Sequence, residues 1–577
     1  MKSQQDVIAS LPEHLQPFVA VQNYSAYTAR DHSIWRFLIK QLAYSLKESA
    51  HPTYFDGLEK TGIGFDAIPR IEDINHKLSD LGWRAVAVDG FLPPAVFMEF
   101  QALKVLAIAV NIRSFEHMLY TPAPDIIHES AGHAPFLVDI DYAEFLQRFG
   151  DYGMRAISNQ HDMALYEAVR ALSIVKESND SSPQQIQQAE DLVKQLQNQK
   201  IDPSEASLLA RLHWWTVEYG LVGATDNHQI FGAGLLSSLA ESQSCQDDQK
   251  VKKLPLTLNS IRTSYDITKP QPQLFVTESC RHLSQVLEEY GRHMCCVRGG
   301  ASALLEAQQA GTVCTSQYNS GLQVSGKLKS VLCDAVGNAI YLATDGATQL
   351  AYQNQELSGH GIEYHSHGFG SPIGHLVAME RCLSDYTVDE LKRHNIILGQ
   401  RVQLNFLSGI KVEGVLSNIL RREQKNLLLS FEDCRVVDVE GNTLFDPSWG
   451  TYDMAVGRRV DSVSGGSADQ ILFPLYETPS NNVTESQEYS QHDLEQFKLY
   501  QRLDELKQIE SSDLDSFIQD LLHFKAPDWL LVFETLEFAQ SLDKCSSYKD
   551  KLLKLLVSDN KDAQQLIQEG LQRLGLD

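Results

Sequence analysis

The stretch PDIIHESAGHAPF, residues 124–136, decides how the first half of the chain is interpreted. It places His128 and His133 five residues apart around a glycine in an apolar run. Five residues advance about 500° on an ideal α-helix, which leaves the two side chains about 140° apart. Gly132 would let the helix end or unwind before the second histidine, so that both imidazoles turn towards one centre. Spacing alone leaves two interpretations open, a metal site and a pair of packed core histidines.

A carboxylate further along the chain favours the metal site. Glu218 lies in the aromatic run LHWWTVEYGL, where an unpaired charge would be costly to bury, so we expect a cation as its partner. Two histidines and one carboxylate that leave three coordination positions open are typical of non-haem Fe(II) oxygenases. The pattern is not the HExxH of zinc proteases, in which two histidines four residues apart share one helical face.

The composition is that of a globular protein and argues against two classes of partner. A chain of 577 residues exceeds the size of a single hydrophobic core, so we expect two to four domains. The net charge of -26 repels phosphate backbones and anionic lipids, which predicts no nucleic-acid and no membrane partner. Residues 95–112, the most hydrophobic long run, are interrupted by charges and predict a buried helix.

The cysteines and the first residues bear on the cellular compartment. The nine cysteines form no CxxC pair and are odd in number, which is typical of reduced thiols. The first residues, MKSQQDVIASLPEHLQPF, do not have the continuous apolar core of a signal peptide. We therefore expect a cytoplasmic protein.

The texture of the sequence divides the chain into three regions. Residues 1–300 read as a mostly α domain, residues 301–480 as a β-rich domain of unknown role, and residues 481–577 as a helical C-terminal region. If these are separate domains, their cores should be independent and joined by exposed linkers.

Two further patterns refine this division. VSGKLKSVL from Val324 and VEGVLSNIL from Val412 form an internal repeat, which predicts duplicated hairpins in a small barrel or sandwich. Between residues 177 and 200, Ser182 as N-cap and Pro183 at the first helical position predict a solvated, Gln-rich helix. In the last region, two apolar stripes predict packed helices: Leu494, Phe497, Leu503 and Leu506, then Phe517, Leu521, Leu522 and Phe524.

Motifs in a fixed order carry a resemblance to a known family. They are YTARDHSIWRFL, IRSFEHMLYTPAPDIIHESAGHAPF, WWTVEYGL, FGAGLLSSLAE and LPLTLNSIRTSYDITKPQPQLFVTES. Over residues 25–300 the chain resembles the tetrahydropterin-dependent aromatic amino acid hydroxylases. The resemblance implies the catalytic fold of this family, Fe(II) and tetrahydropterin as cofactors, and O2 and a free aromatic amino acid as substrates, with phenylalanine expected.

The resemblance also implies roles around the metal. It makes His128, His133 and Glu218 the iron ligands, and it makes Glu129 a catalytic residue that faces the pterin and the oxygen site. Leu92 and Phe97 fall where the family cradles the pterin ring, although core packing explains them at least as well. A histidine expected on the pterin side is Ala107 in this chain.

The substrate side of the site follows in the same way. Arg113 resembles the guanidinium that clamps the substrate carboxylate, a task that suits its planar fork of donors. Thr121, Trp214 and Gly234 match positions that line the amino acid pocket. Ser237 matches a hydroxyl that orients a ligand histidine, and Asp125 either does likewise or caps the helix that carries His128.

Alternatives to a hydroxylase remain open from the sequence. A zinc-dependent hydrolase with Glu129 as general base would contain zinc and work without O2, and a catalytically lapsed protein would only bind a partner. In the stretch SGHGIEYHSHGFGSPIG, His360, His365 and His367 could form a second metal site, but a Gly-rich surface loop is favoured because no close carboxylate completes it. A homo-oligomer formed through the C-terminal region is one further expectation.

Overall fold

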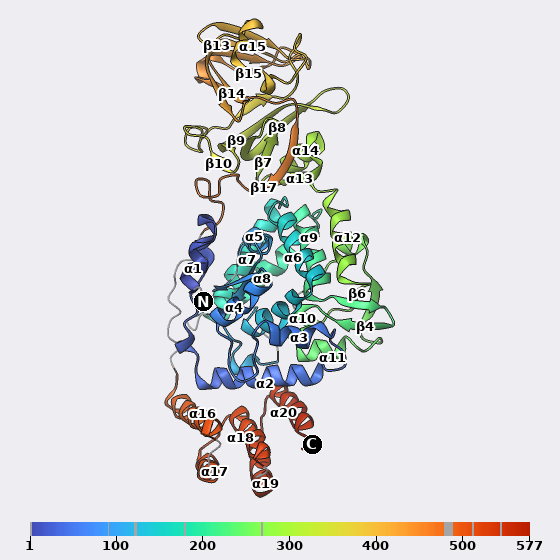
Figure 1. Cartoon of the computed structure of the whole chain (residues 1–577), viewed down its shortest axis with the longest axis vertical. Coiled ribbons are helices and arrows are strands. Elements are labelled where there is room, and N and C mark those ends of the chain that lie inside the picture. The colour runs from blue at the N-terminus through green and yellow to red at the C-terminus, as the bar shows by residue number, and fades with distance from the viewer. Residues whose placement is uncertain are drawn as a thin grey trace.

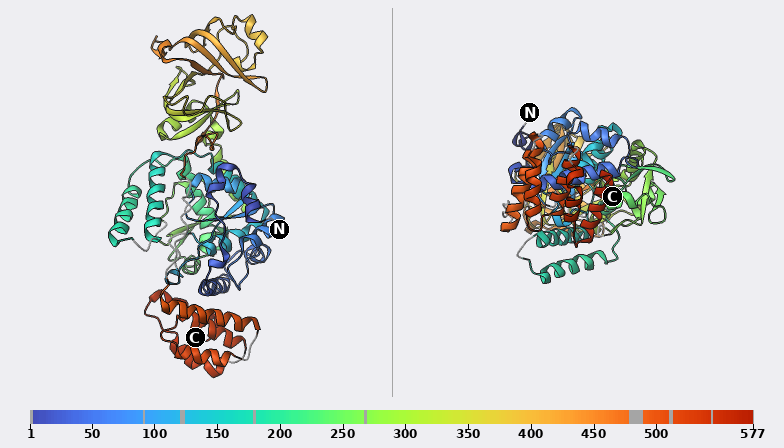
Figure 2. Two further views of the ribbon diagram at one scale, coloured as in Figure 1. Left: turned by 90° about the vertical axis from the view of Figure 1, so that its left-hand side faces the viewer. Right: turned by 90° about the horizontal axis from the view of Figure 1, so that it is seen from below.

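The structure is a computed structural model of the chain and describes residues 3–90, 92–119, 124–177, 181–266, 269–477, 489–509, 513–542 and 545–576. Along its longest axis the molecule has a helical body in the middle, two β-sheets at one end and a group of helices at the other (Figure 1). The turned view keeps this order (Figure 2). No helix in the described part of the chain is long and apolar enough to cross a membrane.

The body is mostly helical, as expected for the first region. Its helices are α1 (Gln4–Ala9), α2 (Ala29–Ser45), α3 (Thr53–Lys60), α4 (Ile71–Asp80), α5 (Pro94–Ala102), α6 (Ile140–Gly153), α7 (Gln160–Glu177), α8 (Pro183–Gln197), α9 (Glu205–His213), α10 (Ala233–Leu236), α11 (Leu239–Ser244) and α12 (Cys280–Gly291). Two small sheets complete it, one of β1 (Arg84–Val88) and β2 (Val105–Ala109), the other in the order β4-β3-β6-β5, with β3 (Leu221–Ala224), β4 (Asn227–Ile230), β5 (Lys252–Pro255) and β6 (Gln273–Thr277).

Helix α2 illustrates why this sequence forms these elements. Thr28 and Asp31 exchange side-chain to backbone hydrogen bonds in a capping box, which satisfies two backbone N–H groups at the start of the helix. Ile34, Leu38 and Leu42 then recur at helical spacing and are buried. The apolar face of α2 therefore packs inward.

Residues 95–112, predicted to be one buried helix, form a helix and a strand, so that prediction was wrong. Helix α5 ends at Ala102, and Lys104 turns the chain with a φ of 57°. Residues 105–109 then pair in parallel with β1, and all of them are buried. A strand buried on both faces has the same continuous apolar sequence as a buried helix, so periodicity could not separate the two.

The Gln-rich segment forms the predicted helix, α8. Ser182 caps it through a capping box with Gln185, and Pro183 lies in its first turn. Lys176 Nζ on α7 lies 2.9 Å from Glu190 Oε1 on α8, and the two helices project together from the body (Figure 2).

Residues 313–465 fold into two sheets, one for each copy of the repeat. The first has the order β10-β9-β8-β7-β17 with β11 beside β9, and the second has the order β12-β13-β14-β15 with β16 beside β14. The strands are β7 (Val313–Tyr318), β8 (Leu322–Cys333), β9 (Ala339–Tyr352), β10 (Gln355–Glu356), β11 (Gly370–Pro372), β12 (Arg401–Asn405), β13 (Lys411–Arg422), β14 (Lys425–Val437), β15 (Thr443–Phe445), β16 (Tyr452–Ala455) and β17 (Val460–Gly465). The copies from Val324 and Val412 lie on the hairpins β8–β9 and β13–β14, so the expected duplicated hairpins are present.

The core of the β-rich region begins before residue 301. Helices α13 (Cys295–Arg298) and α14 (Gly300–Ala310) bury Cys295, Ala303 and Leu304 against the first sheet. Met294 belongs instead to the core of the body. The two cores thus meet near residue 295, a few residues before the predicted boundary.

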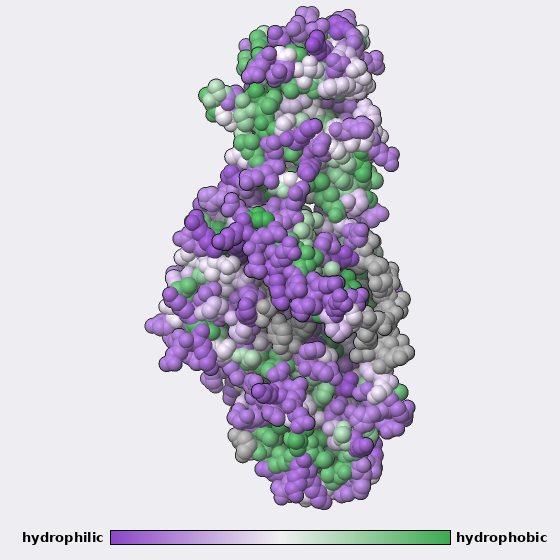
Figure 3. All heavy atoms as spheres, turned by 180° about the vertical axis from the view of Figure 1, so that it is seen from behind, coloured by the Kyte–Doolittle hydropathy of each residue, from purple (hydrophilic) through white to green (hydrophobic). Residues whose placement is uncertain are grey.

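The last region forms the predicted helices. They are α16 (Gln491–Ile509), α17 (Leu514–His523), α18 (Trp529–Ser541), α19 (Cys545–Leu555) and α20 (Lys561–Leu574), which we call the tail. Most residues of the predicted stripes are buried, for example Leu503 and Phe517, whereas Leu494 is exposed. Apolar atoms also gather over the tail on the face that Figure 3 shows.

The tail shares a core with the body. Arg36 of α2 and Glu534 of α18 form a buried ion pair, and Ser33 Oγ donates to Glu534 Oε2 at 2.6 Å. The ring of Phe37 meets those of Trp529 and Phe533 edge-on, and both tail rings belong to the hydrophobic core of the body. The tail and the body therefore share part of one hydrophobic core.

Candidate metal centre

The segment that carries the two histidines is a widened helix. Ile127–His133 is a π-helix, in which hydrogen bonds run from residue i to residue i+5, so five residues make close to one turn. His128 and His133 therefore point the same way without any unwinding. Gly132 serves a different purpose from the one predicted, because a Cβ there would lie 2.8 Å from the carbonyl oxygen of Ala233. The glycine lets α10 approach the π-helix closely.

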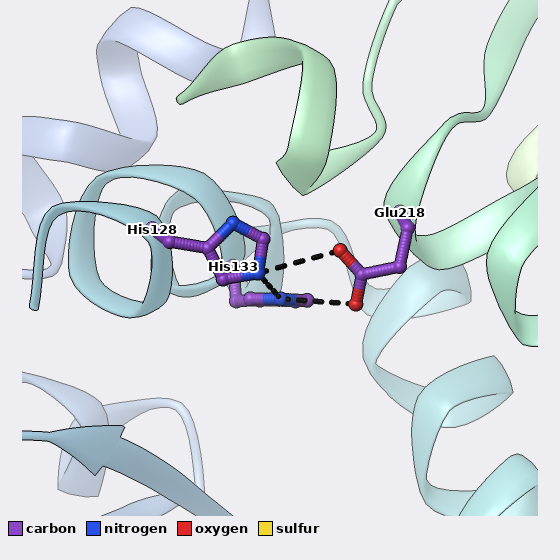
Figure 4. A group of neighbouring side chains, drawn as sticks. All are labelled: His128, His133 and Glu218. Atoms are coloured by element: carbon purple, nitrogen blue, oxygen red, sulfur yellow. Dashed lines mark hydrogen bonds and ion pairs between the residues drawn. The ribbon is translucent and has the colours of Figure 1, made fainter. Parts of the chain in front are cut away.

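The structure brings the three predicted ligands together (Figure 4). The Nε2 atoms of His128 and His133 lie 3.1 Å apart, and each lies 3.4 Å from an oxygen of Glu218. Ligand atoms that bind one ion at about 2.1 Å and at right angles lie about 3 Å apart. The triangle therefore has the size of one face of an octahedral metal site.

The negative charge of Glu218 faces imidazole rings. Burial would raise the pKa of Glu218, but His133 and His128 outweigh it and hold the pKa of this carboxyl well below its ordinary value. Among the described residues, no lysine or arginine nitrogen lies within 4.0 Å of the Glu218 carboxylate. A buried carboxylate that faces two imidazoles is a donor set suited to a divalent cation.

Ser237 fixes the orientation of the first histidine. Its Oγ lies 3.0 Å from His128 Nδ1 and donates to the carbonyl oxygen of Ala233 at 2.8 Å. Because the hydroxyl hydrogen is engaged there, Oγ accepts from Nδ1–H, which leaves the lone pair on Nε2. The contact expected for Ser237 is thus present.

Arg113 and Asp125 form a buried pair that the sequence did not reveal. Asp125 accepts from Arg113 Nε at 2.7 Å and from Nη2 at 2.9 Å, and also from the backbone N–H of His128 at 3.0 Å. Burial would raise the pKa of Asp125, but Arg113 lowers it below its ordinary value. Asp125 therefore caps the helix of His128 and also holds the guanidinium. Among the described residues, the other edge of Arg113 has one long contact, from Nη1 to Met118 O at 3.4 Å.

Trp214 and Gly234 lie beside the ligands, while Thr121 lies outside the described residues. Trp214 stacks between Tyr265 and Tyr219, with ring centroids 4.4 and 4.6 Å away. Its indole Nε1 is buried without a hydrogen-bond partner among the described residues. A Cβ at Gly234 would lie 3.0 Å from the carbonyl oxygen of Glu218. The glycine thus permits close packing behind the ligand, a role that pocket lining alone does not describe.

Residues assigned to the pterin side occupy the edge of a hydrophobic cluster. Leu92 and Phe97 are half-buried and pack against the apolar side chains between β1, β2 and α5. Ala107 lies inside this cluster on β2. Glu129 is buried next to the ligands, with Oε2 3.9 Å from His133 Nε2 and without a hydrogen bond in the described part of the chain. Burial raises the pKa of Glu129 to about 7.

His213 was missed by the sequence analysis. It is buried, and its Nδ1 lies 3.8 Å from Glu218 Oε1. Burial lowers its pKa to about 4, so the ring is neutral at pH 7. The available signal was spacing, because His213 precedes Glu218 by five residues and Trp214–Glu218 is again a π-helix.

This geometry defines a class of protein, in which two histidines and one carboxylate hold a single metal ion on one face. The model of the family described as biopterin-dependent aromatic amino acid hydroxylase matches residues 13–169 and 189–296. The N-terminal half of the chain is therefore similar to this family. The break in the match coincides with the α7–α8 projection.

Individual relatives agree with this assignment. The chain is 28% identical over 264 residues to a phenylalanine-4-hydroxylase of Pseudomonas aeruginosa, covering 46% of this chain and 84% of that protein. It is 29% identical over 268 residues to the enzyme of that name from Chromobacterium violaceum, covering 46% and 75%. A solved structure of phenylalanine hydroxylase from the latter organism superimposes with 25% identity and a TM-score of 0.37, over 49% of this chain and 88% of that one.

Proposed function

We propose that the protein is a monooxygenase that hydroxylates the ring of a free aromatic amino acid, using Fe(II), a tetrahydropterin and O2. The observation that carries the proposal is the triangle of His128, His133 and Glu218, with sides of 3.1 to 3.4 Å, inside a region that is similar to the hydroxylase family. When bound, Fe(II) and the pterin together activate O2 for insertion of one oxygen atom into the ring.

The protein's own groups hold and orient the reactants. His128, His133 and Glu218 hold the iron, and Ser237 fixes the tautomer of His128. Arg113 binds the substrate carboxylate through the Nη1 and Nη2 edge, because Asp125 engages the Nε and Nη2 edge.

The pterin and the substrate ring complete this assignment. Leu92, Phe97 and Glu129 face the pterin. Trp214 offers an aromatic wall to the substrate ring, with Thr121 and Gly234 as further pocket residues. Asp125, by pairing with Arg113 and capping His128 at once, ties the substrate side of the site to the metal side.

Phenylalanine is the proposed substrate. The relatives from Pseudomonas aeruginosa and Chromobacterium violaceum are named phenylalanine-4-hydroxylase, and each match covers 46% of this chain. Phenylalanine, tyrosine and tryptophan differ by groups worth only about 1–3 kcal/mol in an apolar pocket, so the preference must be measured.

The family match does not favour the two alternatives. A zinc hydrolase would use Glu129 as base and would not need O2, and a lapsed protein would have no reason to keep the complete triangle together with Arg113. Self-association through the tail stays a prediction, consistent with the exposed apolar side chains of Val557 and Leu494.

One experiment separates these functions. The full chain would be loaded anaerobically with Fe(II) and mixed with O2, tetrahydropterin and each aromatic amino acid in turn, and the products separated by chromatography. We expect tyrosine from phenylalanine, with a requirement for both iron and pterin. Zinc-dependent activity without O2, or no turnover of any of the three amino acids, would overturn the proposal.

A further inference from the structure

A second cluster of metal-ligand type lies in the β-rich region, far along the chain from the first. His360, His365 and Asp453 place their ligand atoms within 4.8 Å of one another, and all three are buried, with exposed fractions of 8%, 7% and 5%. The sequence favours a Gly-rich surface loop over a metal site here, because no cysteine or close carboxylate completes the histidine pattern. The structure supplies that carboxylate from β16, which returns beside the loop that carries the histidines. His367, the other histidine considered, is exposed and lies outside the cluster.

The two imidazoles face each other at ligand spacing. His360 Nδ1 lies 3.2 Å from His365 Nε2 and 3.9 Å from Asp453 Oδ2. In a tetrahedral site with bonds of about 2.0–2.1 Å, ligand atoms lie about 3.3 Å apart. The His360–His365 distance matches this value, the His360–Asp453 distance exceeds it by about 0.6 Å, and all three ligand atoms lie within 4.8 Å of one another. Side-chain movements of about one ångström would bring all three atoms to one ion.

The backbone holds both histidines in place. The carbonyl of His360 accepts from the N–H of Leu350 at 2.9 Å, and the carbonyl of His365 accepts from the N–H of Thr348 at 3.2 Å. Both carbonyls thus accept hydrogen bonds from the backbone of β9, which fixes the loop at each histidine.

A hydrogen bond orients the Asp453 carboxylate, and among the described residues no lysine or arginine pairs with it. Ser430 Oγ, opposite Asp453 across the β14–β16 ladder, donates to Asp453 Oδ1 at 2.6 Å and leaves Oδ2 towards the histidines. In the described part of the chain, no lysine or arginine nitrogen lies within 4.0 Å of this carboxylate. A buried carboxylate is costly without a compensating positive charge.

Another cluster with the right residue types has an explanation of its own. Glu205, Cys295 and Glu306 also lie close together, but the Glu205 carboxylate accepts from the backbone N–H groups of Ile157 and Cys295, and Arg298 pairs with Glu306. Burial raises the pKa of the Cys295 thiol, so it is not a ready thiolate ligand. In this cluster Glu205 accepts backbone hydrogen bonds and Glu306 pairs with an arginine, whereas Asp453 pairs with no lysine or arginine among the described residues.

We propose that His360, His365 and Asp453 bind a divalent transition-metal ion such as Zn²⁺. The ion fastens the loop attached to β9 of the first sheet to β16 of the second, and its remaining coordination positions are filled by water or a small ligand. The site is separate from the proposed iron centre and does not depend on the chain being a hydroxylase.

The test uses the full chain with the first site removed. The double variant His128→Ala/His133→Ala would be stripped with a chelator and titrated with Zn²⁺, and the bound metal measured by elemental analysis. We expect one equivalent. Adding His365→Gln or Asp453→Asn should weaken that binding at least tenfold, whereas adding His367→Gln, the exposed neighbour in the same loop, should leave it unchanged. The proposal is overturned if no equivalent binds, or if His365→Gln and Asp453→Asn bind zinc as before.

A second measurement needs no change to the new site. The X-ray absorption spectrum of zinc bound to the His128→Ala/His133→Ala chain should show back-scattering from two imidazoles. A shell of oxygen ligands alone would mean adventitious surface zinc and would overturn the assignment, even if the His365 and Asp453 variants fail to fold.

Discussion

The two histidine and carboxylate clusters solve the same geometric problem in different ways. Both use histidines five residues apart, His128 and His133 in the body and His360 and His365 in the β-rich region. In the body a π-helix makes five residues close to one turn, while in the β-rich region a loop is held to β9 at each histidine. A five-residue spacing between two histidines therefore does not show whether a π-helix or a loop carries them, and the neighbouring residues have to decide.

The surroundings also predict different uses. The first cluster lies among groups suited to a reaction, with Glu129, Trp214 and Arg113 nearby, and His213 as an additional buried imidazole. The second has a serine behind its carboxylate and an exposed tyrosine, Tyr364, against its imidazoles. We therefore expect chemistry at the first cluster and ion binding that links two sheets at the second.

The largest expected effect separates the two clusters by activity. His133→Ala or Glu218→Ala should abolish both iron retention and hydroxylation, because two remaining protein ligands hold the ion poorly. Iron content by elemental analysis and product formation by chromatography would be measured together. His367→Gln serves as the histidine control and should keep full activity. Full iron stoichiometry in either ligand variant would contradict the assignment of the first cluster.

The next largest expected effect is on the stability of the body, which holds the first cluster. Glu534→Ala removes the buried carboxylate that pairs with both Arg36 and Lys507, leaves Asp504 as the carboxylate partner of Arg36, and should destabilise the body by about 3 kcal/mol. Urea unfolding would measure this change in the free energy of unfolding, with the release of iron from the first cluster as the signal. Asp520→Ala, which breaks the exposed pair with Arg502, should cost no more than about 1 kcal/mol.

The same pair predicts a dependence on pH. Burial would raise the pKa of Glu534, but Lys507 and Arg36 outweigh it and lower the pKa to about 2. A carboxyl with a lowered folded-state pKa stabilises the fold above its unfolded pKa of about 4.3, and this contribution is lost as the pH falls towards 2. The difference in stability between the native chain and Glu534→Gln should therefore shrink between pH 5 and pH 2. A constant difference would exclude this ion pair as its source.

A chain that ends near residue 300 is a related case. Independent domains would leave such a fragment soluble and active, but Trp529 and Phe533 complete the core of the body against Phe37. Cutting there would also remove most of α14 and the first sheet, and would expose Cys295 and Ile157, which pack in the same core. We now expect the fragment to lose solubility, whereas the intact chain under the same conditions stays in solution.

The two clusters also differ in how much of each could be predicted from the sequence. His128, His133 and Glu218 could be predicted because each lies in a distinctive local motif that resembles one family. Asp453 could not be predicted as a partner of His365, since only the pairing of β16 with β14 brings it there. The Arg113–Asp125 pair and the Arg36–Glu534 pair were missed for the same reason, because charge pairing depends on tertiary contacts that no periodicity encodes.

Substrate binding gives the next smaller effect. Arg113→Lys should raise the KM for the amino acid about tenfold to a hundredfold and change the KM for the pterin far less, because a point charge cannot replace a two-point donor. Steady-state kinetics with each reactant varied would test this. Arg148→Lys, on the surface, should change neither constant. Equal rises in both constants would indicate that Arg113 acts only through Asp125 as a structural pair.

The smallest effect compares the two hydroxyls that stand behind the clusters. Ser237 accepts from His128 Nδ1 in the first, and Ser430 donates to Asp453 Oδ1 in the second. Loss of a group that orients a ligand commonly costs tenfold or more in metal affinity, so we expect Ser237→Ala to weaken iron binding about tenfold and Ser430→Ala to weaken zinc binding about tenfold. Each should leave the other ion unaffected, because different cores surround the two clusters. Competition titrations with a metal-binding dye would measure both constants in both variants. If Ser430→Ala also weakened iron binding, the two clusters would be coupled through the fold, and the second could not be regarded as a separate site.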